Sequence, residues 1–298
     1  MLRDEARFGV IAAVTVSLIW GLSFVAASMV LKTLSPVTLA TLRFILATIL
    51  FTPIMASNAL KRALPSRPDL REMAILGFLS ISLYFWLQYT GVKYAGAGVS
   101  AILVVGFIPI LTGVASAFIL KENMGRRGVI GAVIGFIGVA MITLPKLTGV
   151  QLNTGFVFGV ACLLGNAICW SMYSTLSRRL MQRSGKPALV TSFITLFGAI
   201  FLIPMSLTSN WGSLGSLTMS QWSCVIYLAV VCSGGGYLLW NFALSRLESV
   251  RAAIWLYLEP VAAFLGEAVI LGVVPDAVTV VGGALVLLGA LVTSISRK

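Results

Sequence analysis

The sequence predicts an all-α integral membrane protein with ten transmembrane helices, arranged as two inverted five-helix repeats. Three observations lead to this prediction. Of the 298 residues, 59% are hydrophobic and only 10% are charged, whereas an ordinary soluble domain has about 25% charged residues. The apolar residues fall into ten long runs, and landmark residues recur at an offset of 150 or 151 positions. A soluble fold of this length could not bury so much apolar surface.

Each of the ten runs is about as long as the helix of about 20 residues that crosses a hydrocarbon core. The predicted spans are 8–31, 36–57, 72–92, 96–119, 127–145, 154–177, 188–208, 221–243, 249–272 and 276–295. The runs are continuous and do not alternate between apolar and polar residues, so they favour helices over the strands of a barrel. The first run lacks a small-residue cleavage site, so we interpret it as a span and not as a signal sequence.

The basic residues predict the orientation. There are 21 Lys and Arg against 9 Asp and Glu. With the connections placed on alternate sides, 17 of the 21 basic residues lie on the side of the N-terminus and three on the other, and Arg43 lies inside the second span. The positive-inside rule then places both termini in the cytoplasm. The basic excess therefore reflects membrane topology, and we expect no nucleic-acid partner.

An internal repeat divides the chain into residues 1–148 and 149–298. The residues that coincide are Trp20 with Trp170, Pro53 with Pro204, Pro109 with Pro260, Gly131 with Gly282, and Gly138 with Gly289. Because five spans is an odd number, the second copy enters the membrane from the opposite side. Inverted repeats are typical of secondary transporters, whose substrate site lies near the midplane between the repeats.

The third and eighth spans carry matching triplets of two aromatic residues and one polar residue at positions i, i+3 and i+4. The triplets are Trp86, Tyr89 and Thr90 in the third span, and Tyr237, Trp240 and Asn241 in the eighth. This spacing places each triplet on one helical face, and Tyr84 and Gln88 lie on a neighbouring face. We predict a cavity lined by aromatic rings, suited to an amphipathic solute. Packing between helices or a place in the interfacial belt is the alternative.

The first and sixth spans add three candidates. Asn166 and Trp170 are one turn apart in the sixth span, and Trp20 is the repeat partner of Trp170. An asparagine in mid-span has to face protein or a water-filled cavity. Asn166 therefore either lines the predicted cavity or bonds another helix.

The ninth span contains Trp255 and Glu259, one turn apart. Glu259 lies about 16 Å into the helix, near the midplane, where an ionisable residue is a functional candidate by default. It binds a substrate ammonium or couples protons, or it forms a structural pair, for example with Arg43 or with a free helix N–H. Arg43 itself could contact a substrate carboxylate, pair internally or extend to the interface. Pro109 and Pro260 each remove a backbone hydrogen bond, so we predict hinges at both prolines.

Several chemistries are excluded. The chain has no histidine, no phosphate-binding loop for ATP, and no nucleophile–base pair or metal-ligand set in the spans. The run from Gly96 to Ala101 fits GxGxxA but lacks the preceding strand of a dinucleotide site. The four cysteines all lie in apolar runs and are expected to pack as small hydrophobic residues. We therefore expect no enzymatic activity, no metal and no cofactor. The glycine-rich fifth and tenth spans are expected to be scaffold helices, packed against each other or against a second protomer.

Two five-helix units with these landmarks resemble the EamA domain pair of the drug/metabolite transporter superfamily. The residues that carry the resemblance are Trp20-Gly21, Pro36 through Arg43-Phe44, Pro109 with Glu122 thirteen residues later, Glu259-Pro260, and the glycines of the fifth spans. The resemblance covers nearly the whole chain. One departure is that position 273, the repeat equivalent of Glu122, is Val.

Within the superfamily the chain is most similar to amino-acid exporters. The resemblance implies alternating-access export of amino acids, aromatic and other neutral ones included, and of related metabolites across a bacterial inner membrane. The expected partners are a small-molecule substrate and the lipid bilayer. A drug or other metabolite carrier, a channel and a scramblase are the alternatives. The exact substrate, the choice between proton coupling and uniport, and the choice between monomer and homodimer stay open.

Overall fold

The computed structural model describes residues 2–61, 63–95, 97–123, 125–144, 153–272 and 276–294. Within these ranges every regular element is helical. The α-helices are α1 (Leu2–Val30), α2 (Pro36–Leu60), α3 (Arg67–Gly77), α4 (Tyr84–Ala95), α5 (Ala97–Ser100), α6 (Phe107–Leu120), α7 (Gly125–Thr143), α8 (Thr154–Ser184), α9 (Pro187–Ser206), α10 (Met219–Ile226), α11 (Gly236–Arg246), α12 (Ser249–Ala253), α13 (Leu258–Leu271) and α14 (Ala277–Ser294).

Three π-helical segments and two 3₁₀ segments interrupt or join these helices. The π-helices are η1 (Phe78–Leu83), η2 (Ala101–Gly106) and η5 (Tyr227–Gly235), and the 3₁₀ helices are η4 (Trp211–Ser216) and η6 (Ile254–Tyr257). Segments η1 and η5 lie inside the third and eighth predicted spans, respectively. A π-helical segment widens one turn of a helix and is frequent at functional sites.

Eight helical segments in the described ranges are long and apolar enough to cross a membrane. They coincide with the first eight predicted spans. The ninth predicted span is not one continuous α-helix, because the 3₁₀ segment η6 separates α12 from α13. The tenth coincides with α14, a shorter apolar helix. The predicted boundary between the repeats, at residues 148 and 149, lies outside the described residues.

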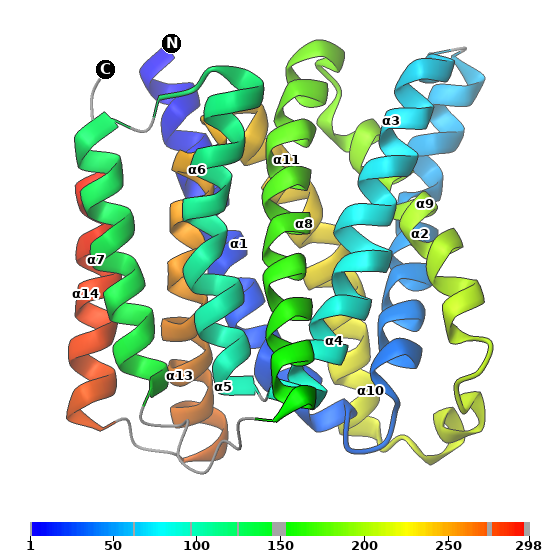
Figure 1. Cartoon of the computed structure of the whole chain (residues 1–298). Coiled ribbons are helices and arrows are strands. Elements are labelled where there is room, and N and C mark those ends of the chain that lie inside the picture. The colour runs from blue at the N-terminus through cyan, green and yellow to red at the C-terminus, as the bar shows by residue number, and fades with distance from the viewer. Residues whose placement is uncertain are drawn as a thin grey trace.

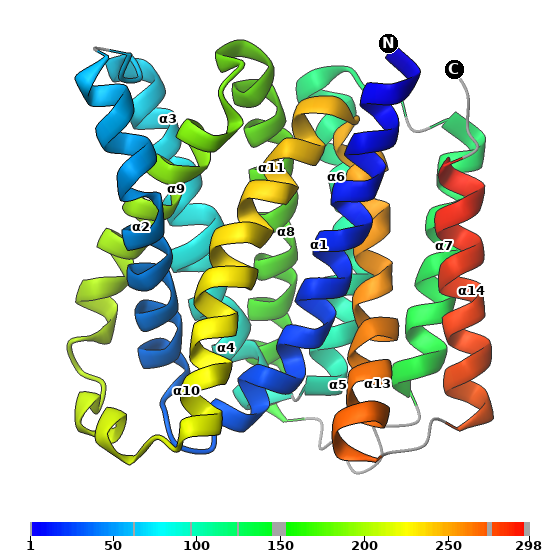
Figure 2. The same cartoon turned by 180° about the vertical axis from the view of Figure 1, so that it is seen from behind.

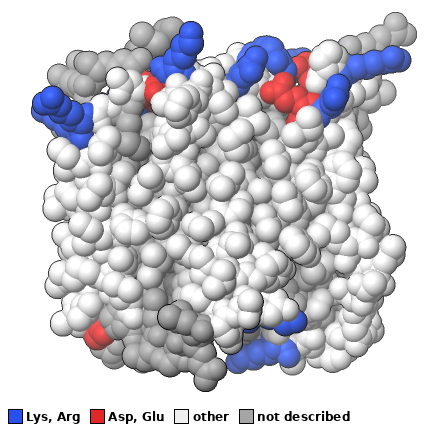
Figure 3. All heavy atoms as spheres, in the orientation of Figure 1, with Lys and Arg blue, Asp and Glu red and all other residues white. Residues whose placement is uncertain are grey.

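The long helices run side by side between two ends of the molecule (Figure 1), and the start of α1 and the end of α14 lie at the same end. Helices α7 and α14 form one edge of the bundle, and α2, α3 and α9 form the opposite edge (Figure 2). Lys and Arg side chains gather at the end that holds the start of α1, whereas the middle band is almost free of charge on the visible face (Figure 3). We call the first of these the basic end.

Helices α7 and α14 approach closely through glycines. A Cβ atom on Gly131 would lie 2.5 Å from the Gly289 carbonyl oxygen, and one on Gly138 would lie 2.6 Å from the Gly282 carbonyl oxygen. Small residues permit such backbone contact between membrane helices. The two glycine-rich helices therefore pack against each other within one chain, which is the first of the two arrangements expected from the sequence.

Candidate functional site

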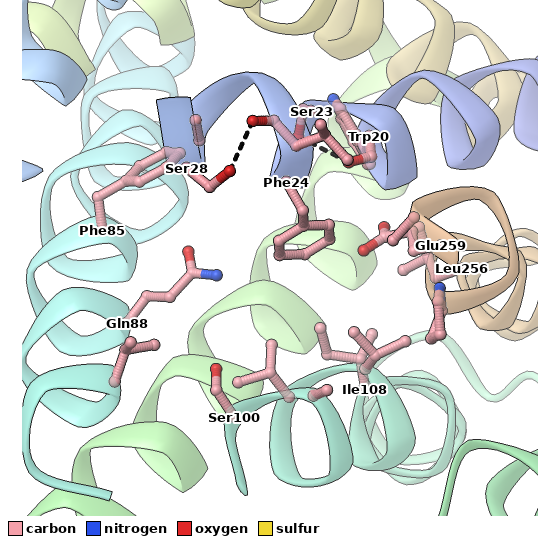
Figure 4. Close-up of a pocket in the computed structure, with 18 of the residues that line it drawn as sticks. Trp20, Ser23, Phe24, Ser28, Phe85, Gln88, Ser100, Ile108, Leu256 and Glu259 are labelled. Carbon is pink, nitrogen blue, oxygen red and sulfur yellow. Dashed lines mark hydrogen bonds between the residues drawn. The ribbon is translucent and has the colours of Figure 1, made fainter. Parts of the chain in front are cut away.

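A cavity of about 520 Å³ lies among α1, α2, α4, α6, α8, α11 and α13 (Figure 4). Nine of the residues singled out in the sequence line it, namely Trp20, Arg43, Tyr84, Gln88, Tyr89, Trp170, Tyr237, Glu259 and Pro260. Its lining also reaches Leu31 near the end of α1, Val92 in α4 and Thr143 at the end of α7. These positions lie away from the basic end, so the cavity extends towards the opposite end of the molecule.

Four aromatic residues form the floor of the cavity. The ring of Trp170 lies 5.2 Å from Trp20, 5.2 Å from Tyr84 and 5.8 Å from Tyr237, between centroids. The Trp20 and Trp170 rings meet edge to face at 81°, a favoured geometry for aromatic pairs. The four residues belong to α1, α4, α8 and α11, so four helices contribute to this surface.

The π-helices orient two rings of the floor. Trp20 donates from Nε1 to the carbonyl oxygen of Cys232 in η5, at 3.0 Å. Tyr237 donates from its hydroxyl to the carbonyl oxygen of Ser80 in η1, at 2.8 Å. Buried indole and phenol groups need such partners. Sequence analysis missed these contacts because no residue pattern in the chain signalled where the π-helices lie.

Two charged side chains line the cavity. Arg43, in α2, donates from Nε to the Ser233 hydroxyl at 2.7 Å, and its guanidinium carbon lies 5.3 Å from the Phe85 ring centroid. Glu259 points into the cavity from α13 (Figure 4). In the part of the chain that the structure describes, no ion pair joins the two, so the suggested structural pairing of Glu259 with Arg43 is wrong.

Trp86 does not line the cavity, and 42% of its surface is exposed on the outside of the bundle. The cavity stripe on α4 consists of Tyr84, Phe85, Gln88, Tyr89 and Val92. Consecutive residues of an α-helix are about 100° apart, so Trp86 falls outside this stripe. Its prediction as a substrate-binding residue is therefore corrected.

Trp255 also lies outside the cavity lining, half-buried among apolar side chains. The prediction assumed an α-helix, in which residues four apart share a face. Trp255 lies in the 3₁₀ segment η6 instead. With three residues per turn, this segment turns Trp255 away from the direction of Glu259.

Trp240 and Asn241 are fully buried behind the floor and do not reach the cavity. The Trp240 ring packs 5.9 Å from that of Trp170. Asn241 accepts hydrogen bonds from the hydroxyls of Tyr173 and Ser177 and donates to Thr191. These two residues hold α8, α9 and α11 together. Their role is therefore packing between helices, which was the alternative to a place in the cavity lining.

Asn166 is likewise buried and outside the lining. Its Nδ2 donates to the carbonyl oxygen of Tyr84 at 2.7 Å. Of the two roles expected for Asn166, lining the cavity or bonding another helix, the structure shows the second. Tyr84 directly follows η1, so Asn166 secures α4 where the regular helix resumes.

The two predicted hinge prolines have similar surroundings. Pro109 lies three residues after the end of η2, and Pro260 lies three residues after the end of η6. Tyr257, the last residue of η6, donates from its hydroxyl to the carbonyl oxygen of Gly106, the last residue of η2, at 3.0 Å. A proline lacks the N–H and clashes with the preceding turn, which accounts for irregular backbone just before each one. Pro260 lines the cavity, whereas Pro109 is buried outside its lining.

An ion pair connects helices at the basic end of the molecule. Glu122, just after α6, pairs with Arg178 of α8 and also accepts the backbone N–H of Ser249, at the start of α12, at 3.0 Å. Arg178 donates to the Leu244 carbonyl oxygen at 3.0 Å. Burial raises the pKa of the Glu122 carboxyl, although the Arg178 guanidinium acts in the opposite direction. One carboxylate thus connects α6, α8 and α12.

The model of the EamA-like transporter family matches residues 7–144 and 157–295. The chain belongs to the EamA-like transporter family. An uncharacterized transporter from Archaeoglobus fulgidus is 30% identical over 94% of this chain and 96% of its own length. A probable amino-acid metabolite efflux pump from Salmonella typhimurium is 28% identical over 93% of this chain and 91% of its own.

Another relative is an uncharacterized inner membrane transporter of Escherichia coli, YhbE, which is 28% identical over 76% of this chain and 70% of its own length. One solved crystal structure of a protein covers 98% of this chain and 97% of its own length. Its TM-score is 0.79 and its sequence identity is 21%. At that identity the match supports the fold alone. The chain is therefore a multi-pass membrane transporter in a lipid environment, with a small molecule as its substrate.

Proposed function

We propose that this EamA-like transporter is a secondary carrier that exports amino acids, aromatic and other neutral ones among them, and related metabolites by alternating access. The observation that carries the proposal is the cavity, which combines an aromatic floor with one cationic and one anionic side chain, Arg43 and Glu259. Such a lining suits a small molecule with an apolar body and charged groups. The relative named as a probable amino-acid metabolite efflux pump supports the same substrate class.

Alternating access between two inverted repeats is the proposed mechanism. In support, the family model matches the chain twice over stretches of similar length, and the surroundings of Pro109 and Pro260 match each other. The cavity extends towards one end only, while the Glu122–Arg178 pair holds the other end. A channel requires a continuous path, so a cavity open towards one side favours a carrier over a channel.

The membrane placement completes the proposal. The basic end would face the cytoplasm of a bacterial cell, with both termini there and the chain in the inner membrane. In support, the visible basic side chains gather mainly at the end where α1 starts and α14 ends. The cavity would then extend towards the outside.

Counterflow in liposomes tests this function. Purified protein reconstituted with an internal amino-acid pool is expected to accumulate labelled amino acids, with saturation, and an imposed pH gradient shows whether protons are coupled. Uptake of no member of a broad amino-acid panel would discard the substrate class and favour a drug or other metabolite carrier. Uptake without saturation or counterflow would favour a channel.

The Glu259→Gln variant tests the role of the buried acid. We expect lower counterflow with an unchanged yield of folded protein, because the amide removes the negative charge and keeps the shape. Glu72→Gln is the matched control, since Glu72 lies near the membrane surface in an exposed pair with Arg183. Wild-type rates of Glu259→Gln with every amino acid of the panel, basic ones included, would give Glu259 a purely structural role.

A further inference from the structure

Arg43 is a buried cation whose nearest partners are uncharged. Only 6% of its surface is exposed, and its contacts are the Ser233 hydroxyl and the rings of Phe44 and Phe85. Among the described side chains no carboxylate lies within ion-pair distance of it. A charge inside a membrane protein is costly unless a counter-ion compensates it. Because Arg43 lines the cavity, a bound anion can supply that counter-ion.

Glu259 is the complementary case on another wall of the cavity. It projects from α13, and the structure records no hydrogen bond or ion pair for its carboxylate among the described residues. In Figure 4, Glu259 faces the cavity from one side, and Phe85 and Gln88 lie on the other. Arg43 packs on Phe85, and α2 and α13 lie on opposite sides of α1 (Figure 2). Arg43 and Glu259 therefore line the cavity from different sides.

Arg43 and Glu259 are separate charged groups of the cavity lining, because no ion pair joins them among the described residues. The ammonium and the carboxylate of an α-amino acid are attached to the same carbon atom, so these two charges lie close together. A solute in which a chain or a ring separates the anionic end from the cationic end can place one charge at Arg43 and the other at Glu259.

We propose that Arg43 and Glu259 are two separate ionic half-sites, and that the carrier favours solutes with a carboxylate at one end and a cationic group at the other. A basic amino acid with a long side chain belongs to this class. Arg43 takes the carboxylate, Glu259 takes the distal cation, and the aromatic floor packs against the intervening methylene groups. Ser233 is a positioning residue, because its hydroxyl holds the Arg43 side chain. The inference rests on the proposed function, since it assumes that this cavity binds the transported solute.

Lysine and norleucine test this inference as a matched pair, because they differ only by the terminal ammonium group. Binding to the purified full-length protein in detergent is measured by isothermal titration calorimetry. A hydrogen bond to a charged group contributes about 1.5–3 kcal/mol, so lysine should bind about tenfold or more tightly than norleucine. In Glu259→Gln this advantage should disappear, while norleucine binding stays unchanged. Glu72→Gln should retain the full advantage.

Variants of the cationic site complete the test. Arg43→Gln should weaken the binding of lysine and of norleucine by the same factor, because the carboxylate of each amino acid loses its cationic partner. Ser233→Ala is the milder variant in case Arg43→Gln does not fold. It should weaken the binding of both amino acids to a smaller extent. Lysine binding no tighter than norleucine, or a lysine advantage that survives in Glu259→Gln, would overturn the inference. Those results would leave the proposed amino-acid transport intact, whereas absence of binding by any amino acid would overturn both.

Discussion

Removing the charge of Glu122 should open the basic end of the transporter. This carboxylate pairs with Arg178 and accepts the backbone N–H of Ser249. The Glu122 and Arg178 side chains are only 8% and 12% exposed, so solvent compensates little for a missing partner. Glutamine at position 122 retains an oxygen for the Ser249 N–H, and the change therefore isolates the contribution of the ion pair.

The size of the effect follows from the single charged hydrogen bond that the variant removes. Hydrogen bonds to a charged group contribute about 1.5–3 kcal/mol. A loss of about 2 kcal/mol changes an equilibrium constant by about 30-fold. Under alternating access the pair forms only while the basic end is closed, so the whole factor should appear in the ratio of closed to open molecules.

Cysteine labelling measures this ratio. Ser174 lies one turn before Arg178 on α8, is fully buried and has no hydrogen-bond partner for its hydroxyl among the described residues. In a background without the four native cysteines, a Ser174→Cys reporter should react with a maleimide up to about 30 times faster in Glu122→Gln than with Glu122 present. No substrate is needed for this measurement.

Two controls keep the result interpretable. Glu72→Gln removes an acid from an exposed pair at the basic end, which contributes under about 1 kcal/mol, so the reporter rate should hardly change. A Val139→Cys reporter, buried between helices away from the pair, should stay unreactive unless the protein unfolds. Equal labelling of Ser174→Cys with and without Glu122→Gln, or equal acceleration by Glu72→Gln, would refute the reasoning.

Three further predictions concern packing and placement. Gly131→Ala should lower the free energy of unfolding by about 1–3 kcal/mol, because its Cβ would meet a carbonyl oxygen of α14 at 2.5 Å; a thermal melt should show no change for Gly215→Ala, which has open space. Tyr257→Phe should lower the free energy of unfolding by about 1 kcal/mol, because the hydroxyl that donates to two carbonyl oxygens is removed. An unchanged midpoint in a denaturant titration would contradict this. In a binding titration, Trp86→Ala should leave ligand affinity unchanged, whereas Trp170→Ala should weaken it. Weaker binding with Trp86→Ala and unchanged binding with Trp170→Ala would show that Trp86, and not Trp170, lines the binding site.

Much of the fold could be predicted because the bilayer is a demanding solvent. Every span has to be apolar and about 20 residues long, so the eight long helices can be recognised in the sequence one after another. The ninth predicted span was the difficult one. Its composition is apolar throughout, but the chain passes through a 3₁₀ turn before Pro260, and hydropathy does not distinguish a 3₁₀ turn from an α-helical turn.

The site was predicted in part for a related reason. Trp20, Trp170 and Glu259 were singled out because two tryptophans 150 positions apart and an acid in the middle of an apolar run are unusual in themselves, and all three line the cavity. Trp86 and Trp255 were misplaced because a spacing of three or four residues indicates that side chains share a face, but not which neighbour that face meets. The direction of a face depends on the helices packed around it.

The sequence by itself determined the class of protein, the positions of the long helices and the segregation of basic residues, because each depends on local composition and on contact with lipid or water. Only the tertiary structure decided which side chains meet. The Arg43–Ser233 bond and the Glu122–Arg178 pair join residues 190 and 56 positions apart. No local pattern specifies such contacts, since they depend on how the long helices pack and where π-helical and 3₁₀ turns change the direction of a side chain.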